Sequence, residues 1–374
     1  MRRLRPMRLV VVTAILMLSL VRYAFALYDD GARYAFVASP ASKAVFVIDM
    51  QLQKLAHTIQ LPRPPAAVVV SERLKALVIS HPAAKALTLI DLQASSLEQI
   101  NYHLDLVPAL LEMSPVGETV AVYDREARRL EIHDIRRREI VLAVGEIDIG
   151  AELSFNADAS GIYWVDASDG SFNALDLWSN SKRIRLAGPG AGLSSMSHSV
   201  DGSIAFISEA TADRVHMIDL RTFEPIMQVS VGRQPGRPWG TSDGRYMLVP
   251  NHGDGTVTAI SAVTGAAMYT VAAVDKPLFV SPGWLDTIAA VVGESGQLAF
   301  INIEDGQLSS RFELQATPAE GVVTSDSRTL AIPVPAAGSL AFFDMRQQTR
   351  ASSIANLPAD IGLPALAISN NLCH

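Results

Sequence analysis

Six polar side chains recur along the chain at nearly equal spacing, and their types could support binding or acid–base chemistry. Each follows the previous one by 42 or 43 residues. Carboxylates, imidazoles and amides can hold a polar ligand, and a histidine beside an acid can exchange protons. Because Asp and Asn are also common turn formers, a local hydrogen-bonding role is the alternative. The six residues are Ser39, His81, Asp124, Asp166, Glu209 and Asn251.

A second feature repeats with the same period. A short apolar run ends, in most copies, in Asp, and this end lies ten residues after each of the six polar positions. The runs end at positions 49, 91, 134, 176, 219, 261, 302 and 344, so the intervals are 41 to 43 residues. A period of ~40–45 residues is typical of a four-stranded propeller blade. The sequence therefore predicts eight blades.

Each repeat reads as four short strands separated by Gly, Ser, Asp and Pro. In the second repeat they are expected at 75–81, 86–92, 97–104 and 108–114. No segment has a sustained helical period, which argues against a parallel α/β sheet. The chain starts with three strands over 34–61 and ends with one apolar strand, 363–370, which we expect to complete the first blade and close the ring. The predicted fold class is all-β: a single eight-bladed β-propeller of four-stranded antiparallel blades over residues 27–374.

We count the strands of each blade outward from the channel. In such a ring the six polar residues lie at the end of the second strand in successive blades. This end is on the same face of the ring as the connections that lead from one blade into the inner strand of the next. The connections carry further charges, including Glu152, Lys276 and Glu320. A ring of mixed charge around the mouth of the central channel follows, and propellers commonly bind ligands there. The arginines suit a small anionic ligand, or else a solvated loop. The predicted ligand-binding residues are His81, Asp124, Asp166, Glu209, Asn251, His252, Arg233, Arg237 and His198.

Metal ligation has four weaker candidates. His81 and His252 lie on opposite blades, so each would act alone or beside a bound cofactor. Cys373 and His374, with the terminal carboxylate, could bind copper or zinc, or they form a frayed tail. With one cysteine, an intrachain disulfide and a four-thiolate zinc site are excluded. No Walker loop, Gly-x-Ser-x-Gly or His-Glu-x-x-His motif occurs, so no catalytic residue is assigned.

The first 26 residues read as a cleavable signal peptide. An arginine-rich start precedes a predominantly apolar run of 13 residues, 9–21, and an Ala-Phe-Ala box ends at residue 26. A membrane helix needs ~20 residues, so no stable anchor is expected. Removing five arginines from a chain of net charge −7 leaves −12, which argues against nucleic acid as a partner. The pattern predicts a periplasmic protein.

The segment 237–251 reads Arg-Pro-Trp-Gly-Thr-Ser-Asp-Gly-Arg-Tyr-Met-Leu-Val-Pro-Asn, and 255–260 reads Gly-Thr-Val-Thr-Ala-Ile. This text resembles the repeat of YVTN-type and cytochrome d1-type propellers, although the histidine of their Pro-His-Gly motif is absent. The resemblance covers residues 34–370. Eight repeats favour the cytochrome d1-like branch, which includes the d1-haem domain of nitrite reductase and accessory proteins of d1-haem maturation. Because no Cys-x-x-Cys-His occurs, covalent c-type haem is excluded.

Three functions follow as hypotheses. The first is a non-enzymatic periplasmic propeller that binds a periplasmic protein or a small ligand on its charged mouth. The second, implied by the resemblance, is an accessory or redox protein that holds a haem d1-type tetrapyrrole or a transition metal. The third is a propeller-type hydrolase or lyase, which lacks an evident nucleophile or metal cluster. The absence of a catalytic motif favours the first.

Overall fold

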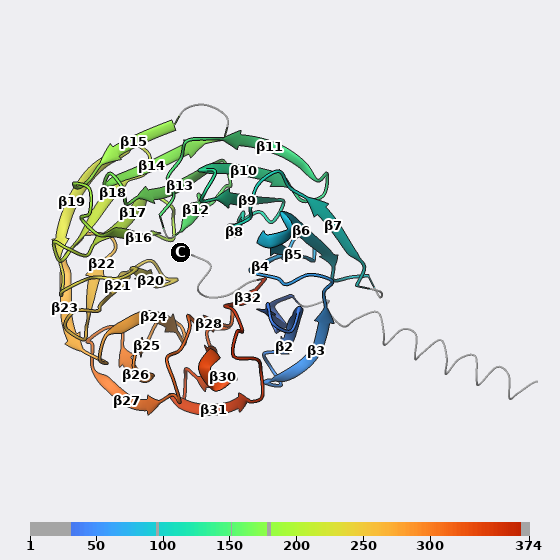
Figure 1. Ribbon diagram of the computed structural model, residues 1–374. Helices are drawn as coiled ribbons and strands as arrows, with labels where there is room; N and C mark the ends of the chain where they lie inside the picture. Colours follow the sequence, from blue (N-terminus) through green and yellow to red (C-terminus); the bar gives the residue numbers. More distant parts are fainter. Residues whose placement is uncertain (1–30, 95–96, 151, 178–180, 368–374) are drawn as a thin grey trace, which may run out of the picture.

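The computed structural model describes residues 31–94, 97–150, 152–177 and 181–367. The predicted signal peptide, residues 1–26, lies outside them. The described residues form eight four-stranded antiparallel sheets arranged as blades around a common axis (Figure 1), and we call the region along this axis, between the inner strands, the channel. The predicted eight-bladed propeller is therefore confirmed. No helix in the described ranges has the length and hydrophobicity needed to cross a membrane.

Each blade takes one inner strand beside the channel and three strands that follow outward. The first four blades, from inner to outer strand, contain the following elements. Blade 1 has β32 (Pro364–Leu366), β1 (Tyr34–Ser39), β2 (Ala44–Asp49) and β3 (Lys54–Gln60). Blade 2 has β4 (Val68–Ser71), β5 (Ala76–His81), β6 (Ala86–Asp91) and β7 (Gln99–His103). Blade 3 has β8 (Leu110–Met113), β9 (Thr119–Asp124), β10 (Arg129–Asp134) and β11 (Glu139–Val144). Blade 4 has β12 (Leu153–Phe155), β13 (Gly161–Asp166), β14 (Ser171–Asp176) and β15 (Ser181–Arg185).

The remaining four blades repeat this order. Blade 5 has β16 (Leu193–His198), β17 (Ile204–Glu209), β18 (Arg214–Asp219) and β19 (Glu224–Ser230). Blade 6 has β20 (Trp239–Gly240), β21 (Tyr246–Asn251), β22 (Thr256–Ser261) and β23 (Ala267–Ala272). Blade 7 has β24 (Pro277–Gly283), β25 (Ile288–Gly293), β26 (Gln297–Asn302) and β27 (Leu308–Glu313). Blade 8 has β28 (Val322–Val323), β29 (Thr329–Val334), β30 (Ser339–Asp344) and β31 (Thr349–Ile354). Three short 3-10 helices are η1 (Gly31–Arg33), η2 (Pro82–Ala84) and η3 (Pro335–Ala337).

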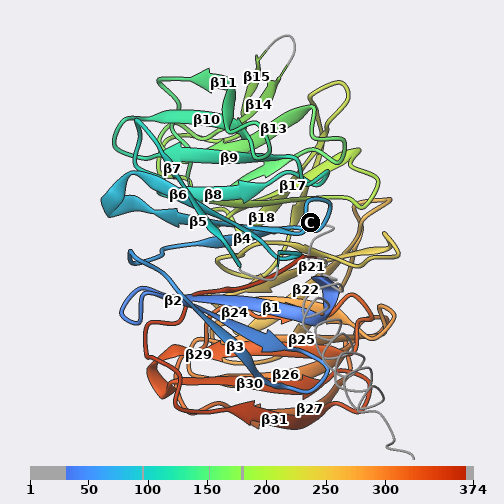
Figure 2. The same ribbon diagram turned by 90° about the vertical axis from the view of Figure 1, so that its right-hand side faces the viewer.

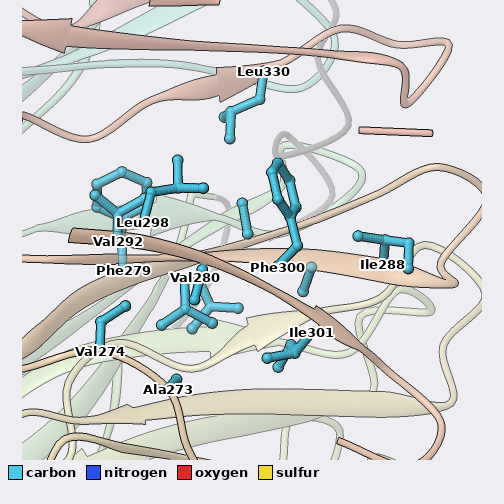
Figure 3. Close-up of a cluster of buried hydrophobic side chains, with 14 of the residues drawn as sticks. Ala273, Val274, Phe279, Val280, Ile288, Val292, Leu298, Phe300, Ile301 and Leu330 are labelled. Carbon is cyan, nitrogen blue, oxygen red and sulfur yellow. The ribbon is translucent and has the colours of Figure 1, made fainter. Parts of the chain in front are cut away.

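The burial of each strand follows from how the blades pack. In blade 1, every residue of β1 and β2 is buried, whereas most of β3 is exposed. The two middle strands have a neighbouring blade on each face, so they are apolar on both faces, whereas the outer strand faces solvent. Figure 3 shows the buried side chains between blades 6, 7 and 8, where Phe279, Phe300 and Leu330 belong to one cluster. This packing between blades is the hydrophobic core.

The C-terminal strand closes the ring, as predicted. β32 pairs with β1, with Leu366 opposite Ala35 and Pro364 opposite Val37. Within the predicted range 363–370, the described strand covers Pro364–Leu366, and residues 368–370 lie outside the described range. Figure 1 shows β32, in red, inside the blue strands of blade 1. The first blade thus combines the two ends of the described chain.

One turn departs from ordinary backbone geometry. Between β24 and β25, Trp284, Leu285 and Asp286 have φ angles of 40°, 55° and 57°. In the described ranges this is the one run of three consecutive non-glycine residues in the left-handed region. The buried Asp286 carboxylate accepts hydrogen bonds from Ser242 N at 2.9 Å and Ser242 Oγ at 2.6 Å in blade 6. These contacts hold the turn in place.

Candidate functional site

The six polar residues predicted from the repeat all end the second strand of their blades, β1, β5, β9, β13, β17 and β21. These strand ends lie on one face of the ring. The turns between the second and third strands of each blade, and the connections that lead into the inner strands, lie on the same face. We call it the mouth face. In Figure 2 the ring is seen from its side, with the strands running between its two faces. The equivalent residues of blades 7 and 8 are Gly293 and Val334.

In blades 2 and 5 these residues form buried hydrogen bonds within the protein. His81 Nδ1 donates to the Pro64 carbonyl oxygen (2.9 Å), and its Nε2 shares a 2.8 Å hydrogen bond with Thr88 Oγ1. Burial lowers the pKa of His81, so its imidazole is neutral near pH 7. The Glu209 carboxylate accepts hydrogen bonds from Arg214 Nε (2.6 Å) and His216 Nε2 (2.7 Å). Although burial raises the pKa of Glu209, these two partners lower it below its usual value.

The other members of the set hold turns and connections. Asn251 Nδ2 donates to Thr256 Oγ1 and Thr258 Oγ1, both at 2.9 Å. The remaining bonds join Asp124 to Val107 N (2.7 Å), Asp166 to Ser168 N (2.9 Å) and Ser39 Oγ to Asp360 (2.8 Å). Each of the six therefore has an intramolecular partner, and a role for them in ligand binding stays a prediction.

A different set of charges meets in the channel. It consists of Glu112 in β8, Glu152 before β12, His198 in β16, Arg237 before β20 and Glu320 before β28. The charges of Arg237 and Glu152 affect the pKa values of both Glu112 and Glu320. The five residues belong to blades 3, 4, 5, 6 and 8, and each lies in an inner strand or in the connection that leads into one, so all five lie around the central channel. We call the five residues the channel cluster.

The position of the channel cluster follows from the backbone. In blade 6, Gly236 N donates to the Pro250 carbonyl (2.8 Å), and in blade 8, Ala319 N donates to the Pro333 carbonyl (2.9 Å). Arg237 and Glu320 each follow these donors directly, so they occupy equivalent positions in their blades. Both stand where the chain enters an inner strand from the mouth face.

Arg237 is the centre of the cluster's electrostatics. Its Nη1 lies 3.0 Å from Glu152 Oε2, and its guanidinium stacks 4.8 Å from the Trp239 ring centroid. Its buried Nε has no hydrogen-bond partner among the described residues. The Glu152 Oε1 atom also accepts a 3.2 Å hydrogen bond from Met196 N. The arginine is therefore held on one side of the cluster.

The channel cluster contains three carboxyl groups but only one guanidinium, so its acidic groups outnumber its permanent positive charge. Burial raises the pKa of Glu112 to about 7; Arg237 opposes this shift, and Glu152 adds to it. The pKa of Glu320 rises for the same reasons in the same order. Burial, aided by the charge of Arg237, lowers the pKa of His198. Near neutral pH the cluster thus contains carboxyl groups that an added cation would stabilise as carboxylates.

A pocket of about 410 Å³ opens on the mouth face beside this cluster. We call it the mouth pocket. His252 lines it, and His252 Nε2 and Lys276 Nζ lie 3.4 and 3.3 Å from the same oxygen of Glu294. The complete lining is Ala210, Thr211, Gln234, Pro235, Gly236, His252, Pro277 and Leu278. The structure thus brings His252 to a pocket and Arg237 and His198 to the channel, while Arg233 is exposed at the edge of the connection between them.

The structure gives little support to a metal site. His81 is enclosed in blade 2 and His252 lies at the mouth pocket of blades 5 to 7. Among the described residues, no group of three His, Cys, Asp or Glu side chains could hold a metal ion. Cys373 and His374 lie outside the described range.

Sequence reasoning missed two arrangements. Glu112 was not a candidate, although it is the one charged residue within the eight inner strands. A lone acid in a short apolar strand was the available signal. A Tyr–His–Glu chain between blades 2 and 3 was also missed: Tyr102 Oη lies 2.7 Å from His133 Nδ1, and His133 Nε2 lies 2.9 Å from Glu131 Oε2. Both His133 and Glu131 are buried, so this chain joins two blades.

No protein-family model matches the chain, and no curated protein does. Solved structures do share its fold. The dihydro-haem d1 dehydrogenase NirN, in complex with DHE, is 15% identical, with a TM-score of 0.75 over 92% of this chain and 77% of that one. BamB from Moraxella catarrhalis is 15% identical, with a TM-score of 0.61 over 79% of this chain and 89% of that one.

A third similar structure is a functionally unknown protein from Desulfotomaculum acetoxidans. It is 11% identical, with a TM-score of 0.55 over 75% of this chain and 95% of that one. At such identities the likenesses show the fold alone. The chain is thus a β-propeller, as the sequence resemblance implied.

Proposed function

We propose that this protein is a periplasmic propeller that binds a ligand or partner protein at the mouth of its channel and catalyses no reaction. The observation that carries the proposal is the Arg237–Glu152 ion pair, around which Glu112 and Glu320 lie near the same channel and within reach of the charge of Arg237. Bringing charged groups together out of bulk water costs free energy, and the other inner-strand residues are uncharged. A binding role explains why these four blades each deliver a charged group to one place.

A cross-linking experiment in the source organism tests this function. The full-length chain carries an affinity tag, and cells are cross-linked before purification. We expect a defined adduct that the Arg237→Gln/Glu152→Gln variant loses. The control is Arg73→Gln/Glu118→Gln, which removes an exposed ion pair of the same 3.0 Å length on the opposite face. The same adducts from all three proteins would count against a binding site in the channel.

The likeness to NirN favours a second candidate, a tetrapyrrole holder. Such a macrocycle carries carboxylate groups, which need cations around them. The channel cluster instead offers three carboxylates and one arginine that is already paired with Glu152. The residues of the channel cluster therefore do not fit the group. Titration with haemin checks this: we expect no saturable Soret shift, and a shift that His198→Ala or His252→Ala abolishes would favour the tetrapyrrole.

A further inference from the structure

The mouth pocket and the channel cluster adjoin through one connection. Gln234, Pro235 and Gly236 line the pocket, and the next residue, Arg237, pairs with Glu152 in the channel. A molecule seated in the pocket would therefore touch the backbone directly before Arg237, which joins the pocket to the Arg237–Glu152 ion pair of the cluster. The two features are best considered as halves of a single site.

The pocket half is suited to an apolar group. Pro235, Pro277, Leu278 and Ala210 contribute apolar surface, and Leu278 is 37% exposed. Its volume of about 410 Å³ lies within the usual range for small-ligand sites, ~300–1,000 Å³. Thr211 and Gln234 add polar atoms to its lining, which suit the amide groups of a peptide backbone.

The channel half is suited to a cation. Glu152 holds Arg237 at 3.0 Å, and Trp239 stacks on the same guanidinium. Glu112 and Glu320 have no comparable ion pair among the described residues. A lysine or arginine reaching them would supply the missing positive charge, and charge complementarity of this kind gives selectivity between partners.

We propose that the site binds a segment of polypeptide in which a lysine or arginine neighbours an apolar side chain. The apolar side chain occupies the mouth pocket, and the cation extends into the channel toward Glu112 and Glu320. This inference rests on the proposed function and specifies the chemistry of its ligand. It replaces the small anionic ligand expected from the two arginines.

Calorimetric titration of the full mature chain tests the inference. The probe is the capped peptide acetyl-Gly-Leu-Lys-Leu-Gly-amide, compared with the same peptide carrying Glu in place of Lys and with spermidine. We expect saturable binding of the lysine peptide, and binding at least tenfold weaker for the other two. Equal or tighter binding of the glutamate peptide, or of spermidine, would overturn the proposal.

Two pairs of variants locate the binding. Leu278→Asn should weaken the lysine peptide about tenfold, while Leu55→Asn, at 41% exposure on the outer strand β3, should leave it unchanged. Glu320→Gln should also lower the affinity for the lysine peptide about tenfold, and Glu118→Gln should leave that affinity unchanged. Thermal unfolding followed by circular dichroism confirms that each variant folds. Unchanged affinity in both Leu278→Asn and Glu320→Gln refutes the site.

The two proposals fail in different ways. If the lysine peptide does not bind but the cellular adduct is still lost in Arg237→Gln/Glu152→Gln, the peptide chemistry is wrong and the binding function stands. If the adduct persists in that variant, the channel is not the binding site, and both proposals fall.

Discussion

Arg237 in blade 6 and Glu152 in blade 4 form a 3.0 Å ion pair that passes over the inner strand of blade 5. Each side chain is 26% exposed, so the pair is partly shielded from water. A contact between non-neighbouring blades differs from the packing elsewhere, which joins adjacent blades face to face. The ion pair therefore depends on the relative positions of blades 4, 5 and 6, and so does the net charge that this part of the channel presents.

This pair should show strong energetic coupling. We expect Arg237→Met to lower the free energy of unfolding by about 1–3 kcal/mol at pH 8, because it leaves neighbouring carboxylates without their cation. Adding Glu152→Gln should restore part of that loss, giving a coupling energy of about 1 kcal/mol or more. Urea unfolding of the wild type, both single variants and the double variant measures it. Strictly additive losses would show that the two residues act independently.

Glu112 should make stability depend on pH. Its pKa is raised from 4.5 to about 7, so between these values the folded protein keeps a proton that the unfolded chain releases. The stability due to this group is full below pH 4.5 and is lost as the pH rises through 7. Glu112→Gln should therefore stabilise the protein by about 1–3 kcal/mol at pH 8 and have little effect at pH 4.5.

Urea unfolding at pH 4.5 and pH 8 checks this prediction. Arg237, Glu152 and Glu320 face the same space, so the difference between variant and wild type is the quantity to compare. The matched control is Glu118→Gln on an exposed turn. A gain of the same size at both pH values would mean that Glu112 does not titrate as described.

Ring closure should depend on the last described strand. A chain ending at residue 358 lacks β32 and also Asp360, whose carboxylate accepts hydrogen bonds from Ser39 Oγ (2.8 Å) and from Ala41 N. The open edge of β1 would then be free to pair with other chains. We expect this truncation to be insoluble or rapidly cut by trypsin. A chain ending at residue 367 is the control and should resist digestion; equal resistance of both would refute the closure.

The left-handed turn of blade 7 should be strained at Leu285. This side chain is 70% exposed, so little packing is lost when it is removed. A non-glycine residue in this conformation costs ~1–2 kcal/mol, which glycine avoids. Leu285→Gly should raise the free energy of unfolding by about 0.5–1 kcal/mol. Leu52→Gly, at 54% exposure without positive φ, should lower it, and a gain in both would remove the conformational explanation.

The fold could be predicted because its signals are periodic. Eight apolar runs at intervals of 41 to 43 residues gave the number of blades, and the unpaired strands at the two ends gave the closure. Strand ends were less certain: the strand predicted over 97–104 is observed as Gln99–His103. Local sequence does not specify where a strand ends, because its last hydrogen bonds depend on the neighbouring strand.

The site was only partly predictable. Asp124 and Glu209 have the spacing of a ring, but spacing does not reveal that each carboxylate is already bonded to its own blade. Arg237 and His198 were predicted at the mouth of the channel, and the structure has them before and within inner strands. The charge of Arg237 acts on Glu112 across blades 3 and 6, and no local pattern encodes an interaction between such distant segments.

The closure of blade 1 also constrains when the protein can finish folding. Ser39 and its partner Asp360 are 321 residues apart in the chain. Since synthesis delivers the N-terminal strands first, β1 to β3 must wait without their innermost neighbour until almost the entire polypeptide has been made. During that interval the edge of β1 that later pairs with β32 is open to other strands, and slow synthesis of the last residues would prolong this exposure.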